Sequence, residues 1–279
     1  MAEKTIVITG GARGLGRLMC EEAARRGARV IVAVRDRDRA AEAMAELARL
    51  AVGPAPELLV VDLSSSASIE AAAGEARRRF ARVDALVNNA GIVNYEGILN
   101  DEGIELSIAT NYLGALRFTE SLLPSMGRGS RIVNLSSSAA TRGSLDVDRP
   151  RVGKGVWKGY RNYASSKLAV LVWSLDLARR LAPSGIAVNA LHPGVVNTGI
   201  TRFPGPLGAL VELILLVRWQ GPELGVRTAV DLALSEEYEG VTGAFFWRDR
   251  RRRLALRHDG EAAASRLRAR TEALLDRLP

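Results

Sequence analysis

Short apolar runs rich in valine, isoleucine and leucine alternate along the chain with longer segments of helical periodicity. A run without polar alternation is typical of a strand that is buried on both faces, as in a parallel sheet covered by helices. The pattern predicts strands at residues 5–9, 28–34, 58–61, 85–87, 131–135, 186–191 and 243–247. The repeated order of strand then helix, with right-handed crossovers, predicts an α/β fold with one doubly wound parallel sheet and helices on both faces.

The chain shows no low-complexity linker and no internal repeat, so we expect residues 1–279 to form a single domain. One connection is unusual. Residues 139–159 are rich in glycine, arginine and aspartate, which predicts a long surface loop.

Hydrophobic residues make up 47% of the chain and charged residues 25%, which excludes global disorder and fibrous structure. The one cysteine, Cys20, cannot form an internal disulfide, and with two histidines it leaves too few ligands for a zinc cluster. The first strand begins almost at once, which leaves no room for a signal peptide, and the most apolar later stretch, 207–217, is too short to span a bilayer. We therefore expect a cytoplasmic protein with no metal and no transmembrane segment.

The net charge of +8 is concentrated near the C-terminus, where residues 248–279 hold ten arginines against five carboxylates. The densest run, 250–253, suits either a phosphate or anionic-membrane contact or a solvated surface turn, and base rates favour the turn. Because no recognition motif accompanies the charge, we predict no nucleic-acid partner.

A glycine-rich turn follows the first predicted strand and opens the first predicted helix. It reads Thr9-Gly10-Gly11-Ala12-Arg13-Gly14-Leu15-Gly16. Such glycines let the backbone turn sharply and approach a pyrophosphate, which then meets the unpaired N–H groups at the helix N-terminus. The position of the turn predicts a dinucleotide site of Rossmann type.

The chain resembles the short-chain dehydrogenase/reductase family over about its first 200 residues. The matching motifs, in chain order, are Thr9-Gly10-x-x-x-Gly14-x-Gly16, Asn88-Asn89-Ala90-Gly91, Asn111, Ser137, Tyr163-x-x-x-Lys167 and His192-Pro193-Gly194. Within the family it is most similar to the retinol dehydrogenase-like branch, because it shares Asn111-Tyr-Leu-Gly114, Leu191-His-Pro-Gly-Val-Val196 and a long interval between the serine and the tyrosine. Many members of that branch carry an N-terminal membrane anchor, which we do not expect here because the first predicted strand begins almost at once.

The resemblance implies an oxidoreductase that interconverts a carbonyl and an alcohol, with Tyr163 as acid and base. Tyr163 and Lys167 are four residues apart and share a helix face, so the lysine ammonium is expected to lower the pKa of the phenol towards neutrality. Ser137, flanked by Ser136 and Ser138, would hydrogen-bond the substrate oxygen. Asn111 would hold a water that links Lys167 to solvent, and the alternative is a helix-interior amide bonded to backbone.

The segment after the second strand, Val34-Arg35-Asp36-Arg37, carries both charges that discriminate between dinucleotides. Arg35 and Arg13 favour NADP(H), because arginine binds a 2′-phosphate that a carboxylate would repel. Asp36 favours NAD(H) instead, unless it caps the following helix. For Asp62, contact with the adenine and capping both remain open. By resemblance, the cofactor-binding residues are Gly10, Arg13, Gly14, Leu15, Gly16, Arg35, Asp62, Leu63, Asn89, Ala90, Gly91, Tyr163, Lys167, Pro193, Gly194, Val196 and Thr198.

Residues 195–220 would form a lid over the substrate, with an apolar helix at 207–217. This helix is either buried, or a pocket wall, or a surface that dips into a membrane. We expect an apolar aldehyde, ketone, steroid or retinoid as substrate. Family members often form homo-oligomers, although the basic segment 248–279 could block such contacts. The alternative function is a non-catalytic dinucleotide-sensing regulator on the same fold.

Overall fold

The protein is described from a computed structural model that covers residues 3–194, 221–252 and 260–276. Its centre is one eight-stranded sheet with the strand order β3-β2-β1-β4-β5-β6-β7-β8. All pairs are parallel except the last, in which β8 runs antiparallel to β7. The α/β doubly wound fold predicted from the sequence is therefore confirmed.

All seven predicted strands are present, with ends that shift by at most two residues. The strands are β1 (Thr5–Thr9), β2 (Arg29–Val34), β3 (Glu57–Val60), β4 (Ala85–Asn88), β5 (Arg131–Leu135), β6 (Ala187–His192), β7 (Phe245–Trp247) and β8 (Arg250–Arg252). The helices are α1 (Gly14–Arg25), α2 (Ala41–Leu50), α3 (Ser66–Arg79), α4 (Leu106–Ile108), α5 (Ala115–Leu122), α6 (Val156–Leu181), α8 (Glu223–Leu234) and α9 (Gly260–Leu275).

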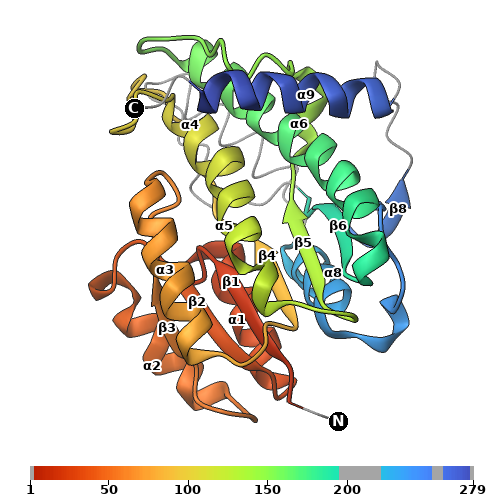
Figure 1. The fold of residues 1–279 in the computed structure, drawn as a ribbon. Coiled ribbons are helices and arrows are strands. Elements are labelled where there is room, and N and C mark those ends of the chain that lie inside the picture. Colours follow the sequence, from red (N-terminus) through yellow and green to blue (C-terminus); the bar gives the residue numbers. More distant parts are fainter. Residues whose placement is uncertain (1–2, 195–220, 253–259, 277–279) are drawn as a thin grey trace.

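Helices cover both faces of the sheet (Figure 1). Successive residues of β1 show the layering, because Ile6 and Ile8 pack with α1 and α8 while Val7 packs with α3, α5 and α6. All three side chains are fully buried. This explains why the predicted strands read as continuous apolar runs, since neither face of the sheet meets solvent.

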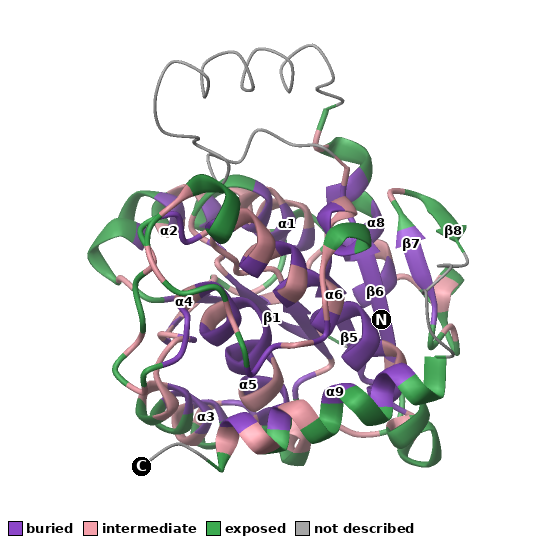
Figure 2. Ribbon diagram, turned by 90° about the horizontal axis from the view of Figure 1, so that it is seen from above, coloured by how far each residue is buried: buried purple, intermediate pink, exposed green. Residues whose placement is uncertain are grey.

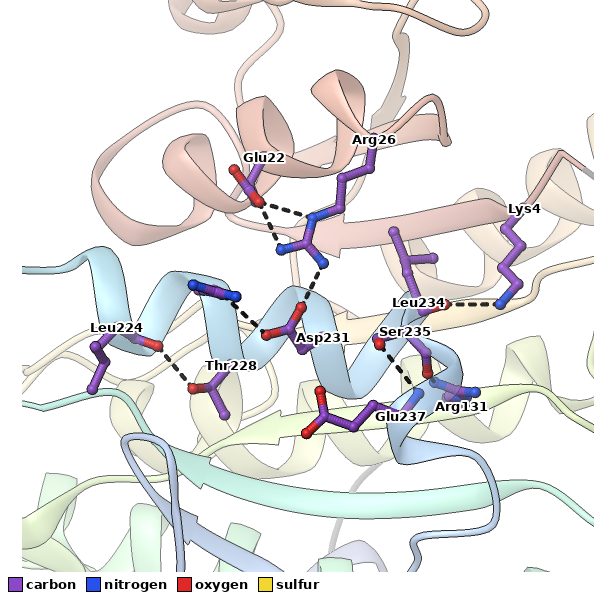
Figure 3. A network of polar contacts seen from close by, with 11 residues as sticks. Lys4, Glu22, Arg26, Arg131, Leu224, Thr228, Asp231, Leu234, Ser235 and Glu237 are labelled. Carbon is purple, nitrogen blue, oxygen red and sulfur yellow. Dashed lines mark hydrogen bonds and ion pairs between the residues drawn. The ribbon is translucent and has the colours of Figure 1, made fainter. Parts of the chain in front are cut away.

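Helix α8 is attached to α1 and to the start of β1 by polar contacts (Figure 3). The guanidinium of Arg26 contacts Asp231 at 2.6 Å and Glu22 at 2.7 Å, which joins α1 to α8. The ammonium of Lys4 donates to the carbonyl of Leu234 at 2.8 Å. These contacts fix α8 in place beside the sheet.

Three features of the second half of the chain are only partly predicted by the sequence. The run 250–252 is a strand at the end of the sheet, with all three arginines exposed, and Arg253 lies outside the described residues. Helix α9 lies across α6 (Figure 1) and is buried on one side only (Figure 2). The long loop is shorter than expected, because a 3₁₀ turn occupies 138–142 and α6 begins at Val156.

The order of the strands reverses between β1 and β4, because the chain builds outward from β1 in one direction and then from β4 in the other. In open α/β sheets, ligands bind outside the carboxyl ends of the strands at such a switch point. Among the described residues, no helix is long and apolar enough to cross a membrane.

Candidate active site

The glycine-rich turn has the backbone that the sequence predicts. Gly10 (φ 68°) and Gly14 (φ 54°) are both in the left-handed region that favours glycine. A side chain on Gly16 would place its Cβ 2.2 Å from the carbonyl oxygen of Gly10, so α1 can pack against the turn only with glycine there. The N-cap residue Arg13 makes no side-chain capping bond, which leaves the first N–H groups of α1 free for an anion.

The ends of β1 and β4 are bound together by Asn89. Its side-chain amide donates to the carbonyl of Thr9 at 2.8 Å, while the Thr9 hydroxyl accepts from the backbone N–H groups of Asn89 and Ala90, both at 3.0 Å. These hydrogen bonds join the ends of the two strands at the switch point. Asn89 therefore holds the glycine turn against the sheet.

A cavity of about 550 Å³ lies at the carboxyl ends of the strands. Its volume falls within the range of small-molecule sites, roughly 300–1,000 Å³. The predicted residues that line it are Gly10, Arg13, Gly14, Leu15, Gly16, Arg35, Asp62, Leu63, Asn89, Ala90, Gly91, Ser137, Tyr163, Lys167, Pro193 and Gly194. Val196, Thr198 and the expected lid, 195–220, lie outside the described residues.

The three adjacent serines after β5 have different partners. Ser136 is buried and donates to the carbonyl of Lys167 at 2.9 Å, whereas Ser137 is hydrogen-bonded to the phenol of Tyr163. Ser138 begins the 3₁₀ turn. The fold therefore brings Ser137, and not its neighbours, to the tyrosine hydroxyl.

Lys167 lies on the same helix as Tyr163 but is bonded elsewhere. Its side chain is buried, and its Nζ donates to the carbonyl of Leu135 at 2.9 Å and lies 5.9 Å from the centre of the Tyr163 ring. Burial lowers the pKa of Lys167 to about 8, because the charged form has lost its water.

The pKa of Tyr163 moves in the direction opposite to the one expected from the sequence. Burial raises it, the hydrogen bond with Ser137 opposes that rise, and neighbouring Tyr160 raises it further. The reason is that the phenol is desolvated, so the cost of charging it outweighs the stabilisation that the sequence predicts from the lysine ammonium.

Asn111 lies outside the cavity, in a π-helical segment (Ala109–Gly114) between α4 and α5. Its side-chain oxygen accepts from the N–H of Ile92 at 2.8 Å, and its amide donates to the Ile92 carbonyl at 2.9 Å and to Ser166 at 3.0 Å. These bonds match the backbone-bonded amide that the sequence left open as the alternative, and the role of Asn111 in holding a water stays a prediction. Asn111 thus joins the segment after β4 to α6, and a π-helical turn at this point is typical of functional sites.

Charged side chains at the end of β2 line the far part of the cavity. Arg13 and Arg35 are exposed, and neither forms an ion pair with any carboxylate of the described residues. Asp36 accepts from the N–H groups of residues 38 and 39 at 3.1 and 3.2 Å and pairs with Arg39 at 3.0 Å. Its carboxylate is therefore already used at the start of the next helical turn, which matches the capping alternative.

Asp62 lines the cavity together with Leu63, and its Oδ1 also accepts from the N–H and the hydroxyl of Ser64 at 2.8 and 2.6 Å. The N-cap of α3 is Ser65 and not Asp62, and contact of Asp62 with the adenine stays a prediction.

His192 and Tyr160 are among the cavity residues that were not predicted as site residues. His192 is 3% exposed, and neither of its ring nitrogens has a hydrogen-bond partner among the described residues. Burial, followed by the charge of Arg248, lowers its pKa to about 4, so the imidazole is neutral at pH 7. Tyr160 lies one helical turn before Tyr163, a spacing that could have identified it, and it stacks on Trp157. His192 could have been identified by its place directly before Pro193.

The comparisons with known proteins agree with this geometry. Residues 4–204 match the family model described as short chain dehydrogenase. Human retinol dehydrogenase 13 is 33% identical over 279 residues, with 98% of this chain and 84% of that protein covered. Human retinol dehydrogenase 14 is 36% identical over 264 residues, with 88% and 78% covered.

Solved structures are similar over nearly the same span. A protein from Mycobacterium paratuberculosis has a TM-score of 0.74 and 29% identity, with 99% of this chain and 94% of that chain covered. A short chain dehydrogenase from Burkholderia cenocepacia J2315, solved in complex with NADP, has a TM-score of 0.70 and 26% identity, with 88% and 96% covered. This chain therefore belongs to the short-chain dehydrogenase/reductase family of oxidoreductases, which use a nicotinamide dinucleotide.

Proposed function

We propose that this protein is an NADP(H)-dependent oxidoreductase that interconverts a carbonyl and an alcohol on a lipophilic small molecule. The observation that carries the proposal is the hydrogen bond between Ser137 and Tyr163 inside the cavity, beside the glycine turn. A proton donor and a hydrogen-bond donor for the substrate oxygen thus lie next to a place built for a pyrophosphate.

The residues present fit a nicotinamide dinucleotide. The free N–H groups of α1 and the close packing at Gly16 suit a pyrophosphate, and the unpartnered imidazole of His192 offers one donor and one acceptor to a bound group. When bound, such a cofactor supplies or accepts the hydride. Pro193 and Gly194 line the cavity close to His192 and would hold the nicotinamide end.

The chain's own residues would manage the proton. The phenol of Tyr163 would donate to the substrate oxygen during reduction and take the proton back during oxidation. Ser137 would hydrogen-bond the same oxygen and stabilise the charge that develops on it. Lys167 has a pKa of about 8, so its side chain is charged over most of the neutral range. This positive charge would favour the phenolate form of Tyr163.

NADP(H) is proposed over NAD(H) because of the charges at the end of β2. Arg13 and Arg35 line the cavity and are free of carboxylates among the described residues, while Asp36 is bonded to backbone and to Arg39. A 2′-phosphate would therefore meet two available guanidinium groups.

A lipophilic substrate is proposed from the aromatic side chains beside Tyr163. Tyr160 lines the cavity, and its ring stacks on Trp157 with the ring centres 6.1 Å apart. The relatives named retinol dehydrogenase support an apolar alcohol or aldehyde of that kind.

The test is NADPH oxidation by the full-length protein with retinal, apolar aldehydes, ketones and steroids, compared with small sugars. We expect turnover of apolar carbonyls and a loss of about 100- to 10,000-fold in kcat for Tyr163→Phe by the usual scale of general acid catalysis, whereas NADPH should still bind to the variant. Tyr160→Phe is the matched control and keeps its turnover. Dinucleotide binding with no turnover of any carbonyl would assign the protein to the sensor class instead.

A further inference from the structure

A second cavity, of about 480 Å³, lies between the loop that precedes α6, the first half of α6 and the C-terminal helix α9. Within the described residues it shares no lining residue with the first cavity. Figure 1 shows α9 crossing α6 at this end of the molecule. The two segments that build the cavity, the arginine-rich loop and the basic C-terminal helix, have no part in the proposed reaction.

The cavity carries a net positive charge. Five arginines line it, whereas the carboxylates of the described residues around it are Asp146 in the lining and Asp148 beside it. The lining arginines are Arg149, Arg151, Arg161, Arg266 and Arg270. Among the described residues, five positive and two negative charges leave an excess of three, which attracts an anion.

The ion pairs show which arginines remain available. Arg266 contacts Asp146 at 2.8 Å, and Arg270 contacts Asp148 at 3.0 Å and Asp146 at 3.5 Å. Arg149 lies 3.8 Å from Asp148. Of the cavity arginines, Arg151 and Arg161 have no carboxylate partner among the described residues, so their guanidinium donors are free for a ligand.

The contacts of these two arginines leave those donors unused. The backbone N–H and carbonyl of Arg151 both bond to the side chain of buried Asn162, each at 2.9 Å, which fixes the backbone at this point of the loop. The guanidinium of Arg161 lies 5.8 Å from the centre of the Trp157 ring. The side chain of Arg151 is exposed, so a ligand would order it on binding.

The chemistry of the lining indicates what binds. Planar guanidinium groups match the oxygens of a phosphate with paired hydrogen bonds, and the excess of three positive charges suits a dianion better than a single carboxylate. We propose that this cavity binds a phosphate group, presented either by a soluble phosphorylated molecule or by a lipid headgroup.

The experiment measures binding of inorganic pyrophosphate to the full-length protein by titration calorimetry. We expect the dissociation constant to rise at least tenfold in the double variant Arg151→Ala/Arg161→Ala. The variant Arg13→Ala/Arg35→Ala reports any pyrophosphate that binds in the first cavity. The matched control Arg49→Ala/Arg78→Ala, at exposed positions outside both cavities, should leave the dissociation constant unchanged. Thermal melting checks that all variants stay folded.

A second experiment identifies whether the phosphate belongs to a lipid or to a soluble molecule. Sedimentation with phosphatidylcholine vesicles, with and without phosphatidic acid, tests the lipid headgroup, and binding that is lost in Arg151→Ala/Arg161→Ala assigns it. Binding of pyrophosphate alone assigns a soluble ligand. The proposal is overturned if neither probe binds, or if only Arg13→Ala/Arg35→Ala loses pyrophosphate binding. No arm depends on turnover, so the proposed oxidoreductase activity can fail independently.

Discussion

The buried ammonium of Lys167 donates to the carbonyl of Leu135 at 2.9 Å, at the end of the strand that leads into Ser137. The bond joins α6 to β5 and so links the two elements that carry the phenol and the serine hydroxyl. It also places a group that is charged below pH 8 in an interior where the charge has lost its water. The hydrogen bond of Lys167 therefore positions the phenol and the serine, whereas its buried charge lowers the stability of the fold.

The first prediction concerns the stability of Lys167→Met. The folded pKa, about 8, lies below the ordinary value of 10.5, so the charged lysine destabilises the fold below pH 8 and this cost disappears as the pH rises towards 10.5. After allowing for the lost hydrogen bond, we expect the variant to be more stable than the wild type by about 2 kcal/mol at pH 7. Urea unfolding measures this difference.

The gain should shrink as the pH approaches 10, and Lys158→Met, at an exposed position on the same helix, should show no gain. A gain that does not change with pH would mean that packing, and not the buried charge, accounts for it. The variant should also lose turnover.

The second prediction concerns acid sensitivity. The pKa of His192 is lowered to about 4, so its contribution to stability is present above pH 6.5 and is lost as the pH falls towards 4. Between pH 7 and pH 5 the free energy of unfolding of the wild type should fall by about 2 kcal/mol more than that of His192→Asn. Unfolding curves at the two pH values measure the difference, and equal losses would contradict a buried neutral imidazole.

The third prediction concerns the choice of dinucleotide. Arg35→Ala should weaken NADPH binding at least tenfold, because a charge-assisted hydrogen bond contributes roughly 1.5–3 kcal/mol. NADH binding should not change. Asp36→Ala is the control at the neighbouring position. Its affinity for NADPH should stay within about twofold of the wild-type affinity, which corresponds to a change of about 0.4 kcal/mol in binding free energy. Fluorescence titration measures both cofactors, and tighter binding of NADH by the wild type would refute the assignment.

The fourth prediction concerns the attachment of α9. The phenol of Tyr112 and the hydroxyl of Thr271 are 2.7 Å apart, and Thr271 donates to the carbonyl of Leu267, so the phenol is the donor. Thr271→Val leaves a buried donor unpaired and should lower the free energy of unfolding by about 1–3 kcal/mol.

Adding Tyr112→Phe to that variant removes the unpaired donor and should recover part of the loss. A fully additive double variant would show that the two residues do not interact. Chemical denaturation of the wild type, the two single variants and the double variant completes the cycle.

Much of the fold and of the cavity lining could be predicted because the signals are local. Apolar runs mark strands that are buried on both faces, and the positive φ angles at Gly10 and Gly14 match the glycine spacing. The identity of the serine beside Tyr163 could be inferred only by register. The structure distinguishes Ser136 from Ser137 because alternate residues leave β5 in opposite directions, one towards α6 and one towards the cavity.

Other features depend on contacts between distant parts of the chain and left no local signal. The direction of the pKa shift of Tyr163 depends on how deeply α6 is buried. The role of Asn111 depends on its bonds with Ile92 and Ser166. Helix α9 carries a weakly amphipathic sequence, and its docking depends on Thr271 and on Arg268, whose guanidinium contacts Asp176 at 2.6 Å.

The arginine run at 250–252 has a consequence for how copies of this protein meet. An outermost strand leaves a row of backbone N–H and C=O groups unpaired, which is a template for intermolecular pairing and aggregation. In β8 each of the three residues presents an exposed guanidinium group. A second molecule that approached strand to strand would bring like charges together, so this edge discourages fibril-like association and keeps the sheet from growing beyond its eighth strand.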